Sequence, residues 1–345
     1  MINLKFYKQM LLNPFQTFFN YTQKKFIIPL FLSCSFFFAG CAMITIQIGG
    51  KISPYEEKTI SGKGEDKILL IDISGVITSK SRSDVTGIKK EPGMVERVKE
   101  QLNKAGKDKK IRAIILRVNT PGGTVTASDI IYHELLECKK KKDVKIIAAM
   151  MDLSTSGGYY ISMSADKIIA HPTTITGSVG VLALKLNMKG LFEKIGIEDE
   201  TVKSGGKKDI TSPFRPFSEE EKKIFQEIID SLSQNFVDVL KSRRKELSTG
   251  EIQKIADGRI YTAQQALKLK MIDKIGYLED AIELAKKEAG LKEAKVITYH
   301  RPHQYKENIY SSNYQGAPHT VNILNIDMNS FTDRMGTKFM YIWMP

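Results

Sequence analysis

A serine followed by two glycines lies at the end of a predicted buried strand. Residues 154–160 read STSGGYY, with Ser156 directly before the glycine pair. Glycines there let a substrate approach the backbone closely, and a helix beginning at that point favours developing negative charge. Ser156 is therefore a candidate nucleophile for acyl transfer. Because Ser-Gly-Gly is common in loops, this interpretation depends on finding a base.

Two further glycine turns follow predicted strands. Residues 117–123 read RVNTPGG, and residues 176–180 read TGSVG. Adjacent glycines permit positive φ, so backbone N–H groups can point into a cleft. A phosphate cradle is the alternative, but neither a GxGxxG pattern nor the P-loop Gly-Lys-Ser/Thr is present in the first turn.

The base that could activate Ser156 is not an obvious histidine. His133 belongs to a predicted helix, residues 172–299 contain no histidine, and His171 precedes a proline at a strand end. The other established partner of a serine nucleophile is a lysine, which must be neutral and therefore shielded from water. The segment 203–210 contains three candidates: Lys203, Lys207 and Lys208. Spacing alone does not choose among them.

The elements that must position these residues alternate between strands and helices. Apolar runs that are continuous rather than alternating predict strands buried on both faces. These runs are residues 68–73, 113–118, 144–150, 167–170 and 296–299. Helical periodicity between them predicts parallel βαβ units. After Pro213 the pattern is mostly helical, beginning with a capping box from Ser218 to Glu221.

The chain divides into five predicted regions. Residues 26–48 carry no charge and are long enough to cross a bilayer, and four lysines without an acid precede them. The regions are a cytoplasmic leader (1–25), a transmembrane anchor (26–48), a stalk (49–65), a catalytic domain (66–299) and a tail (300–345). A cleaved signal peptide and lipidation at Cys41 are alternatives to the anchor.

Composition excludes several classes of function. The formal net charge is +13, spread in small groups without interleaved aromatic residues, which indicates a basic surface near anionic lipid rather than nucleic-acid binding. Cys138 is the single cysteine beyond the apolar segment, so an internal disulfide or a cysteine-rich metal site is excluded there. We expect no metal and no cofactor.

Taken together, five ordered motifs resemble the signal peptide peptidase A family. Its patterns R-x-N-S/T-P-G-G, S-G-G-Y-Y, T-G-S-I/V-G-V, K-S-G-x-x-K-D and A-D-G-R-x-Y match residues 117–123, 156–160, 176–181, 203–209 and 256–261. The resemblance covers residues 66–299. It implies an α/β, Clp/crotonase-like fold of repeated ββα units, here with an N-terminal transmembrane anchor.

The resemblance also implies roles for individual residues. Ser156 would be the nucleophile, Lys208 the general base, and Ser178 the hydroxyl that orients Lys208. The amides of Gly123 and Gly157 would form the oxyanion hole. The implied protein is a homo-oligomeric serine endopeptidase of a bacterial inner membrane. Its catalytic domain would lie on the exocytoplasmic side and cleave remnant signal peptides and other unfolded, apolar-rich polypeptides.

Other interpretations remain beside this one. A crotonase-type acyl-CoA enzyme would need glutamates in the glycine turns, where none occurs. A catalytically idle scaffold or a lipid-attached structural protein would make no use of the paired serine and lysine. Thr155 replaces the family's usual alanine and is expected to narrow the cleft. Because periodicity is lost after His300, the tail is a candidate for reaching the active-site groove. Its apolar patches at 321–326 and 339–343 indicate that it docks somewhere.

Overall fold

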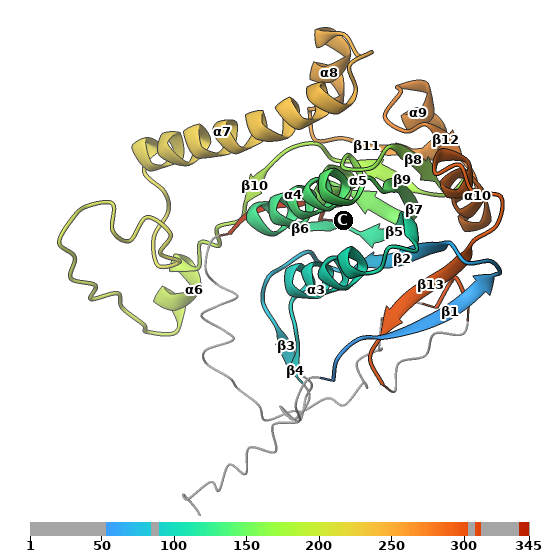
Figure 1. Cartoon of the computed structure of the whole chain (residues 1–345). Coiled ribbons are helices and arrows are strands. Elements are labelled where there is room, and N and C mark those ends of the chain that lie inside the picture. Colours follow the sequence, from blue (N-terminus) through green and yellow to red (C-terminus); the bar gives the residue numbers. More distant parts are fainter. Residues whose placement is uncertain (1–52, 84–89, 303–307, 312–337, 345) are drawn as a thin grey trace, which may run out of the picture. The chain divides into compact units, whose positions relative to one another are not determined.

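The computed structural model describes residues 53–83, 90–302, 308–311 and 338–344 (Figure 1). By internal contacts the chain separates at Gly49, and all described residues belong to the second unit, Gly50–Pro345. The predicted leader and anchor lie outside the described residues. Among the residues described, no helix is long and apolar enough to cross a membrane.

A mixed sheet forms the centre of the domain. Its strands, in spatial order, are β1 (Glu56–Gly62), β13 (Lys295–His300), β2 (Lys67–Ser74), β5 (Ile111–Thr120), β7 (Lys145–Thr155), β8 (Lys167–Ala170) and β12 (Lys274–Ile275). All neighbouring pairs from β13 to β12 are parallel, and β1 is antiparallel to β13. The predicted α/β class with parallel βαβ connections is confirmed.

Helices cover both faces of this sheet, which explains the continuous apolar runs in its strands. The helices α3 (Met94–Lys107) and α4 (Val125–Lys142) lie on one face, as Figure 1 shows. There Leu69 and Leu116 belong to the larger hydrophobic core. The helix α10 (Leu278–Glu288) covers the opposite face, where Ile68 and Ile115 belong to a second core. Successive strand residues thus enter opposite cores.

Shorter elements complete the domain. The strand β7 runs into α5 (Gly157–Ser162) and also pairs with β9 (Ile175–Gly177), which pairs in turn with β11 (Ile260–Thr262). The later helices are α7 (Glu219–Arg243), α8 (Thr249–Ile255) and α9 (Ala263–Lys268). The predicted capping box of α7 is present, because the Ser218 hydroxyl accepts from the Glu221 amide. A two-stranded ribbon joins β3 (Arg82–Ser83) and β4 (Lys90–Glu91).

The tail forms part of a second, smaller sheet. The strand β14 (Phe339–Ile342) lies between β6 (Gly122–Thr124) and β10 (Leu182–Ala183), antiparallel to both. We predicted that residues 339–343 dock somewhere, and they dock on the glycine turn that follows β5. The apolar patch at 321–326 lies outside the described residues.

Part of the predicted stalk has regular structure. Residues 56–62 form β1 and pair with β13, rather than leading irregularly to the domain. Most side chains of β1 are exposed, because it is an edge strand whose outer face meets solvent. That exposure explains its polar, charge-rich sequence, which resembles a linker. Residues 56–62 thus form part of the central sheet.

Candidate active site

Ser156 lies on a strained turn between β7 and α5. Its backbone has φ +53° and ψ −114°, a conformation that non-glycine residues rarely adopt and that costs about 1–3 kcal/mol. The Ser156 amide donates to the Gly177 carbonyl at 2.7 Å, and its carbonyl accepts from the Tyr160 amide at 2.9 Å. Ser156 is only 1% exposed. Its Oγ has no hydrogen-bond partner among the described residues.

The turn that carries Ser178 lies directly beside the Ser156 turn. In the parallel pair of β7 and β9, Thr155 is opposite Gly177. Ser178 has φ +53°, and its amide donates to the Arg259 carbonyl at 2.7 Å. A side chain on Gly177 would come within 2.6 Å of the Tyr261 ring. The A-D-G-R-x-Y motif therefore fixes the position of the Ser178 turn.

The first glycine turn is held from three sides. The Thr120 hydroxyl donates to the Gly75 carbonyl at 2.6 Å and accepts from the Gly122 amide at 3.0 Å. The Ile77 amide donates to the Gly122 carbonyl at 2.9 Å. A Cβ on Gly123 would lie 2.0 Å from the Ile77 carbonyl oxygen. Only glycine fits this close approach of two backbones.

Both glycine turns converge on the carbonyl of Tyr341. A Cβ on Gly122 would lie 2.0 Å from the Tyr341 oxygen and 2.9 Å from the Gly157 amide nitrogen. A Cβ on Gly157 would lie 3.1 Å from the same oxygen. The structure therefore brings the turns of Gly123, Gly157, Ser156 and Ser178 together. The backbone carbonyl of β14 lies between the two turns predicted to form the oxyanion hole.

The side chain of Tyr341 fills an aromatic pocket beside this point. It is 1% exposed and stacks on Tyr160 with ring centroids 5.2 Å apart. Phe236 of α7 lies 4.7 Å from the Tyr341 ring, and the Tyr341 hydroxyl donates to the Leu232 carbonyl at 2.9 Å. Burial raises the pKa of Tyr341 above its ordinary value, so the phenol stays protonated.

Thr155 does not line a cleft, contrary to our expectation. Its side chain is fully buried, and Thr155 Oγ1 has no hydrogen-bond partner among the described residues. A buried hydroxyl without a partner costs roughly 1–3 kcal/mol. We therefore expect Thr155→Val, which keeps the shape and removes the hydroxyl, to raise the free energy of unfolding by about 1 kcal/mol. Thermal unfolding of the full chain would measure it, and an unchanged or lower melting temperature would contradict it.

Lys208 does not contact Ser156 within one chain. It lies in the long connection between α6 (Lys189–Lys194) and α7, which leaves the central sheet (Figure 1). Residues 201–208 are all exposed, and a Cβ added to Gly205 or Gly206 would meet no described atom within 4 Å. The structure thus assembles four of the five predicted site residues and leaves the fifth on an exposed loop.

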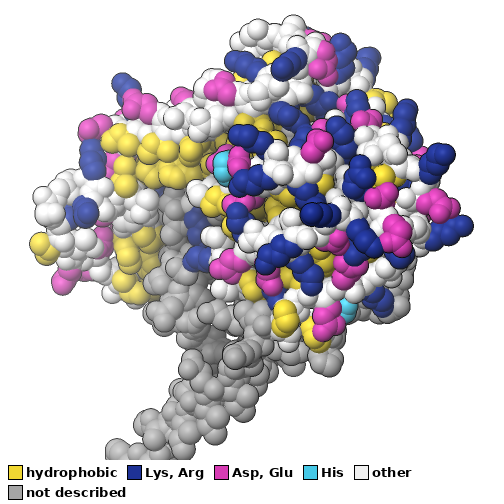
Figure 2. Space-filling view, viewed as in Figure 1, with side chains coloured by type: hydrophobic (Ala, Val, Ile, Leu, Met, Phe, Trp, Pro, Cys, Tyr) yellow, Lys and Arg dark blue, Asp and Glu magenta, His cyan; other side chains and the backbone are white. Residues whose placement is uncertain are grey.

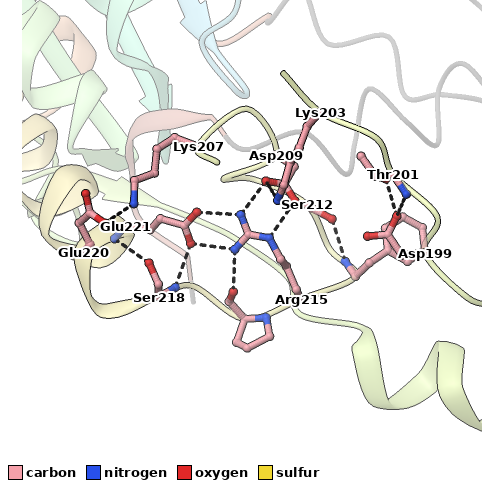
Figure 3. Close-up of polar contacts among 12 residues, drawn as sticks. Asp199, Thr201, Lys203, Lys207, Asp209, Ser212, Arg215, Ser218, Glu220 and Glu221 are labelled. Atoms are coloured by element: carbon pink, nitrogen blue, oxygen red, sulfur yellow. Dashed lines mark hydrogen bonds and ion pairs between the residues drawn. The ribbon is translucent and has the colours of Figure 1, made fainter. Parts of the chain in front are cut away.

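The two neighbouring lysines are both engaged in ion pairs. Lys203 Nζ lies 2.7 Å from Asp209 Oδ1, and Lys207 Nζ pairs with Glu220 (Figure 3). Lys208 has no ion-pair or hydrogen-bond partner for its side chain among the described residues. An ion pair stabilises the charged form of a lysine and opposes its use as a base. Of the three candidates, Lys208 is the one that is not held in this way.

The sequence analysis did not identify the polar side chains that link the strands carrying the site. Asn119 Nδ2 donates to Asp152 Oδ2 at 3.0 Å, and its Oδ1 accepts from the Leu153 amide at 3.2 Å, which joins the ends of β5 and β7. Arg117, on the same strand as Asn119, forms a buried ion pair with Asp72 of β2. The signal was available, since Arg117 and Asn119 belong to the first motif. No group of three or more potential metal ligands occurs among the described residues.

Comparison with known proteins places the chain in a family. The pattern of peptidase family S49 matches residues 138–292. A protein of Enterococcus faecium classed as signal peptide peptidase SppA is 40% identical over 244 residues, which span 71% of this chain and 70% of that protein. The chain belongs to peptidase family S49. It is therefore a serine peptidase with a mixed α/β fold.

Two more distant sequence relatives agree with this placement. The chloroplastic serine protease SPPA of Arabidopsis thaliana is 33% identical over 68% of this chain and 34% of its own length. Protease 4 of Haemophilus influenzae is 32% identical over 64% of this chain and 34% of its own length. A ClpP1 mutant from Listeria monocytogenes superposes with a TM-score of 0.40 at 16% identity, covering 62% of this chain and 94% of that one.

Proposed function

We propose that this S49 peptidase is a Ser–Lys dyad endopeptidase, with Ser156 as nucleophile and Lys208 as general base. The observation that carries the proposal is the state of Ser156. Its hydroxyl is buried and has no partner among the described residues, and it lies on a strained turn beside the glycine turns that would form an oxyanion hole. A hydroxyl in that state costs free energy, which is typical of a group whose partner arrives with the reaction.

Lys208 would reach Ser156 from a neighbouring subunit of a homo-oligomer. Within one chain Lys208 is exposed, whereas a lysine base must be shielded from water. The stretch from the end of β10 through α6 to Lys208 also exposes large apolar side chains, namely those of Leu184, Leu186, Leu191, Ile195, Ile197 and Val202. Figure 2 shows apolar side chains gathered beside α6 and under α7. Packing of this surface on the next copy would shield Lys208 from water, as a lysine base requires.

The chemistry would be acyl transfer. Neutral Lys208 accepts the Ser156 proton as Oγ attacks a peptide carbonyl carbon. The amides of Gly123 and Gly157 donate to the oxyanion, and Ser178 orients the lysine. Lys208 then gives its proton to the leaving amine as the C–N bond breaks. In the second half, Lys208 takes a proton from the water that attacks the ester carbon, and gives it to Ser156 Oγ as the ester C–O bond breaks and the acid leaves.

The strand β14 suggests how an extended peptide could bind. It pairs with β6 through main-chain contacts and places one aromatic side chain in the Tyr160 and Phe236 pocket. When a peptide binds as an added strand, the protein contacts the peptide backbone and every second side chain. This mode of binding suits unfolded, apolar-rich substrates. We therefore propose such peptides, remnant signal peptides among them, as the substrates.

The segment 26–48 would anchor the enzyme in a bacterial inner membrane. The catalytic domain, with its Clp/crotonase-like fold, would lie on the exocytoplasmic side.

The test is to trap the covalent intermediate. The full chain is incubated with an apolar peptide ester whose acyl-enzyme hydrolyses slowly, and its intact mass is measured. We expect the mass of one acyl group to be added and mapped to the peptide that contains Ser156. Ser156→Ala should show no adduct. An adduct on another residue, or none with the assembled native enzyme, would overturn the proposal and favour the idle scaffold.

A further inference from the structure

Arg215 binds two carboxylates from opposite sides (Figure 3). Its Nε and Nη2 donate to the two oxygens of Asp209, both at 2.8 Å. Its Nη1 and Nη2 donate to the two oxygens of Glu221, at 2.8 and 2.7 Å. Both contacts are bidentate, the geometry that a planar guanidinium supports and a lysine does not. We call Asp209, Arg215 and Glu221 the arginine clasp.

The clasp joins a loop to a helix. Glu221 is the third residue of α7, and its carboxylate also accepts from the Ser218 amide at 2.9 Å. Glu221 is only 2% exposed. At its other end, α7 enters the main core, where Phe236 and Leu240 are fully buried. Asp209, by contrast, follows Lys208 directly. The clasp therefore links the segment of Lys208 to a rigid element that also lines the aromatic pocket.

Besides the clasp, this segment is linked to α7 by the ion pair of Lys207 with Glu220, and such an exposed pair contributes little. Residues 201–208 are exposed, and a side chain on either loop glycine would meet open space. The Phe192 and Phe214 rings stack 4.6 Å apart, but they lie on either side of the segment and not within it. Because Lys208 is bonded to Asp209, the clasp fixes the backbone from which the Lys208 side chain extends. A misplacement of about 1 Å can cost roughly a hundredfold in rate.

The clasp also balances charge beside the base. The two carboxylates are matched by Arg215 and by Lys203, which pairs with Asp209. Among the other charged neighbours, Lys207 pairs with Glu220. Lys185 lies beside the clasp, where its Nζ donates to the Arg215 carbonyl at 3.0 Å and interacts electrostatically with Asp209 and Glu221. Loss of the Arg215 charge would make the surroundings of Asp209 and Lys208 more negative, and a nearby negative charge favours the protonated lysine.

Acid does not open the clasp in the range where such an enzyme would work. Hydrogen bonds from Arg215 and from the Ser218 amide lower the pKa of Glu221 to about 2. Arg215 and Lys203 likewise hold the pKa of Asp209 well below its usual range. A depressed carboxyl pKa contributes stability above the ordinary value, about 4, and that stability is lost only as pH falls through the lowered value. A change in activity near neutral pH or above therefore does not come from titration of these two carboxyl groups.

We propose that Arg215 is a positioning residue for the general base, because it clasps Asp209 onto the first turn of α7 and neutralises the carboxylate next to Lys208. This inference rests on the proposed Ser–Lys dyad. It gives the connection between α6 and α7 a specific task. In this arrangement the exposed face of the connection packs on the neighbouring subunit. The clasp fixes the backbone position from which the Lys208 side chain extends.

The test compares Arg215→Gln, Arg215→Lys and native full chain by pH profiles of kcat and kcat/KM on an unfolded apolar peptide, from about pH 6 to about pH 11. For Arg215→Gln we expect kcat to fall about tenfold or more with KM little changed. The pKa of the acidic limb should rise by about one unit. Arg215→Lys retains the positive charge but not the planar guanidinium that binds both carboxylates. The pKa of the acidic limb should therefore return to its native value, while kcat stays low.

Controls separate the possible failures. Lys63→Gln removes a charge from an exposed pair with Glu293, outside α6, α7 and the loop between them, and should leave both parameters unchanged. Thermal unfolding and native mass confirm that each variant folds and assembles. Unchanged kcat and pKa in Arg215→Gln, or a kcat loss that only follows loss of folded protein, would overturn the inference. Lys208→Ala is assayed alongside. If it stays active, the dyad fails and the inference with it, whereas an inactive Lys208→Ala beside a normal Arg215→Gln overturns the inference alone.

Discussion

Mixing Ser156→Ala subunits with Lys208→Ala subunits should restore activity that neither variant has alone. Each variant by itself would lack half of every proposed dyad, and loss of a nucleophile or its base in a serine protease costs about 10⁶-fold in kcat. We expect the same loss here for each pure variant. The reason for recovery is that the two residues of one active site would come from different chains, since Ser156 Oγ has no partner among the described residues of its own chain.

The size of the recovery follows from random assembly. In an equal mixture, half of the subunits carry Ser156 and half carry Lys208. If each site takes its serine from one subunit and its lysine from the next, about one half times one half of the sites are complete. The mixture, unfolded and refolded together to exchange subunits, should therefore reach about one quarter of native activity. Peptide hydrolysis per mole of sites is the measurement.

Two controls make this result decisive. Each variant is refolded alone and must assemble to the native mass, because an unassembled variant would be inactive for another reason. A refolded mixture with no activity, beside a fully active native control, would show that serine and lysine act within one chain. Full activity of Lys208→Ala alone would move the base elsewhere, with Lys207, Lys203 and His171 the next residues to test.

Removing residues 338–345 should make the site more accessible to added peptides. In the structure β14 pairs with β6. The Tyr341 carbonyl lies between the glycine turns, and the Tyr341 ring lies in the aromatic pocket. A tethered competitor of this kind acts at an effective concentration of the order of millimolar. We therefore expect the truncated chain to show a KM about tenfold lower or more, with a similar kcat. Initial rates on an unfolded apolar peptide measure this change.

Further variants test whether the change in KM comes from removal of β14 itself. Tyr341→Ala keeps the strand and removes its anchoring ring, so its KM should lie between those of the native and truncated chains. Met344→Ala changes an exposed side chain beyond β14 and should leave KM unchanged. A synthetic peptide of residues 338–344 should inhibit the truncated chain. If truncation leaves KM unchanged in folded protein and this peptide does not inhibit, β14 does not occupy the substrate position.

The sequence by itself determined the fold class and the local chemistry. The apolar runs that became β2, β5, β7 and β8 were continuous because both faces of each strand are buried, and no distant contact is needed to recognise that pattern. Caps such as Ser218 likewise act within one helical turn. The five motifs indicated the residues of the site, because glycine turns, a nucleophile and a base are each encoded over a few neighbouring positions.

Only the tertiary structure decided which of these residues meet. Ser156, Ser178 and Gly123 come from distant segments, and they lie together because β5, β7 and β9 end at neighbouring positions of one sheet. Pairing partners depend on the whole fold. For that reason the sequence did not reveal that residues 56–62 form an edge strand or that residues 339–342 lie on the glycine turn.

The same reason explains the two features found only in three dimensions. The pocket of Tyr341 combines α5, α7 and the tail, and the arginine clasp joins Asp209 to Glu221 across a loop whose sequence has no periodicity. Side-chain contacts of this kind depend on geometry that propensity and spacing do not encode. The sequence supplied the candidate reacting groups of this S49 peptidase. Folding determined that the proposed base lies on an exposed loop, away from the proposed nucleophile of its own chain.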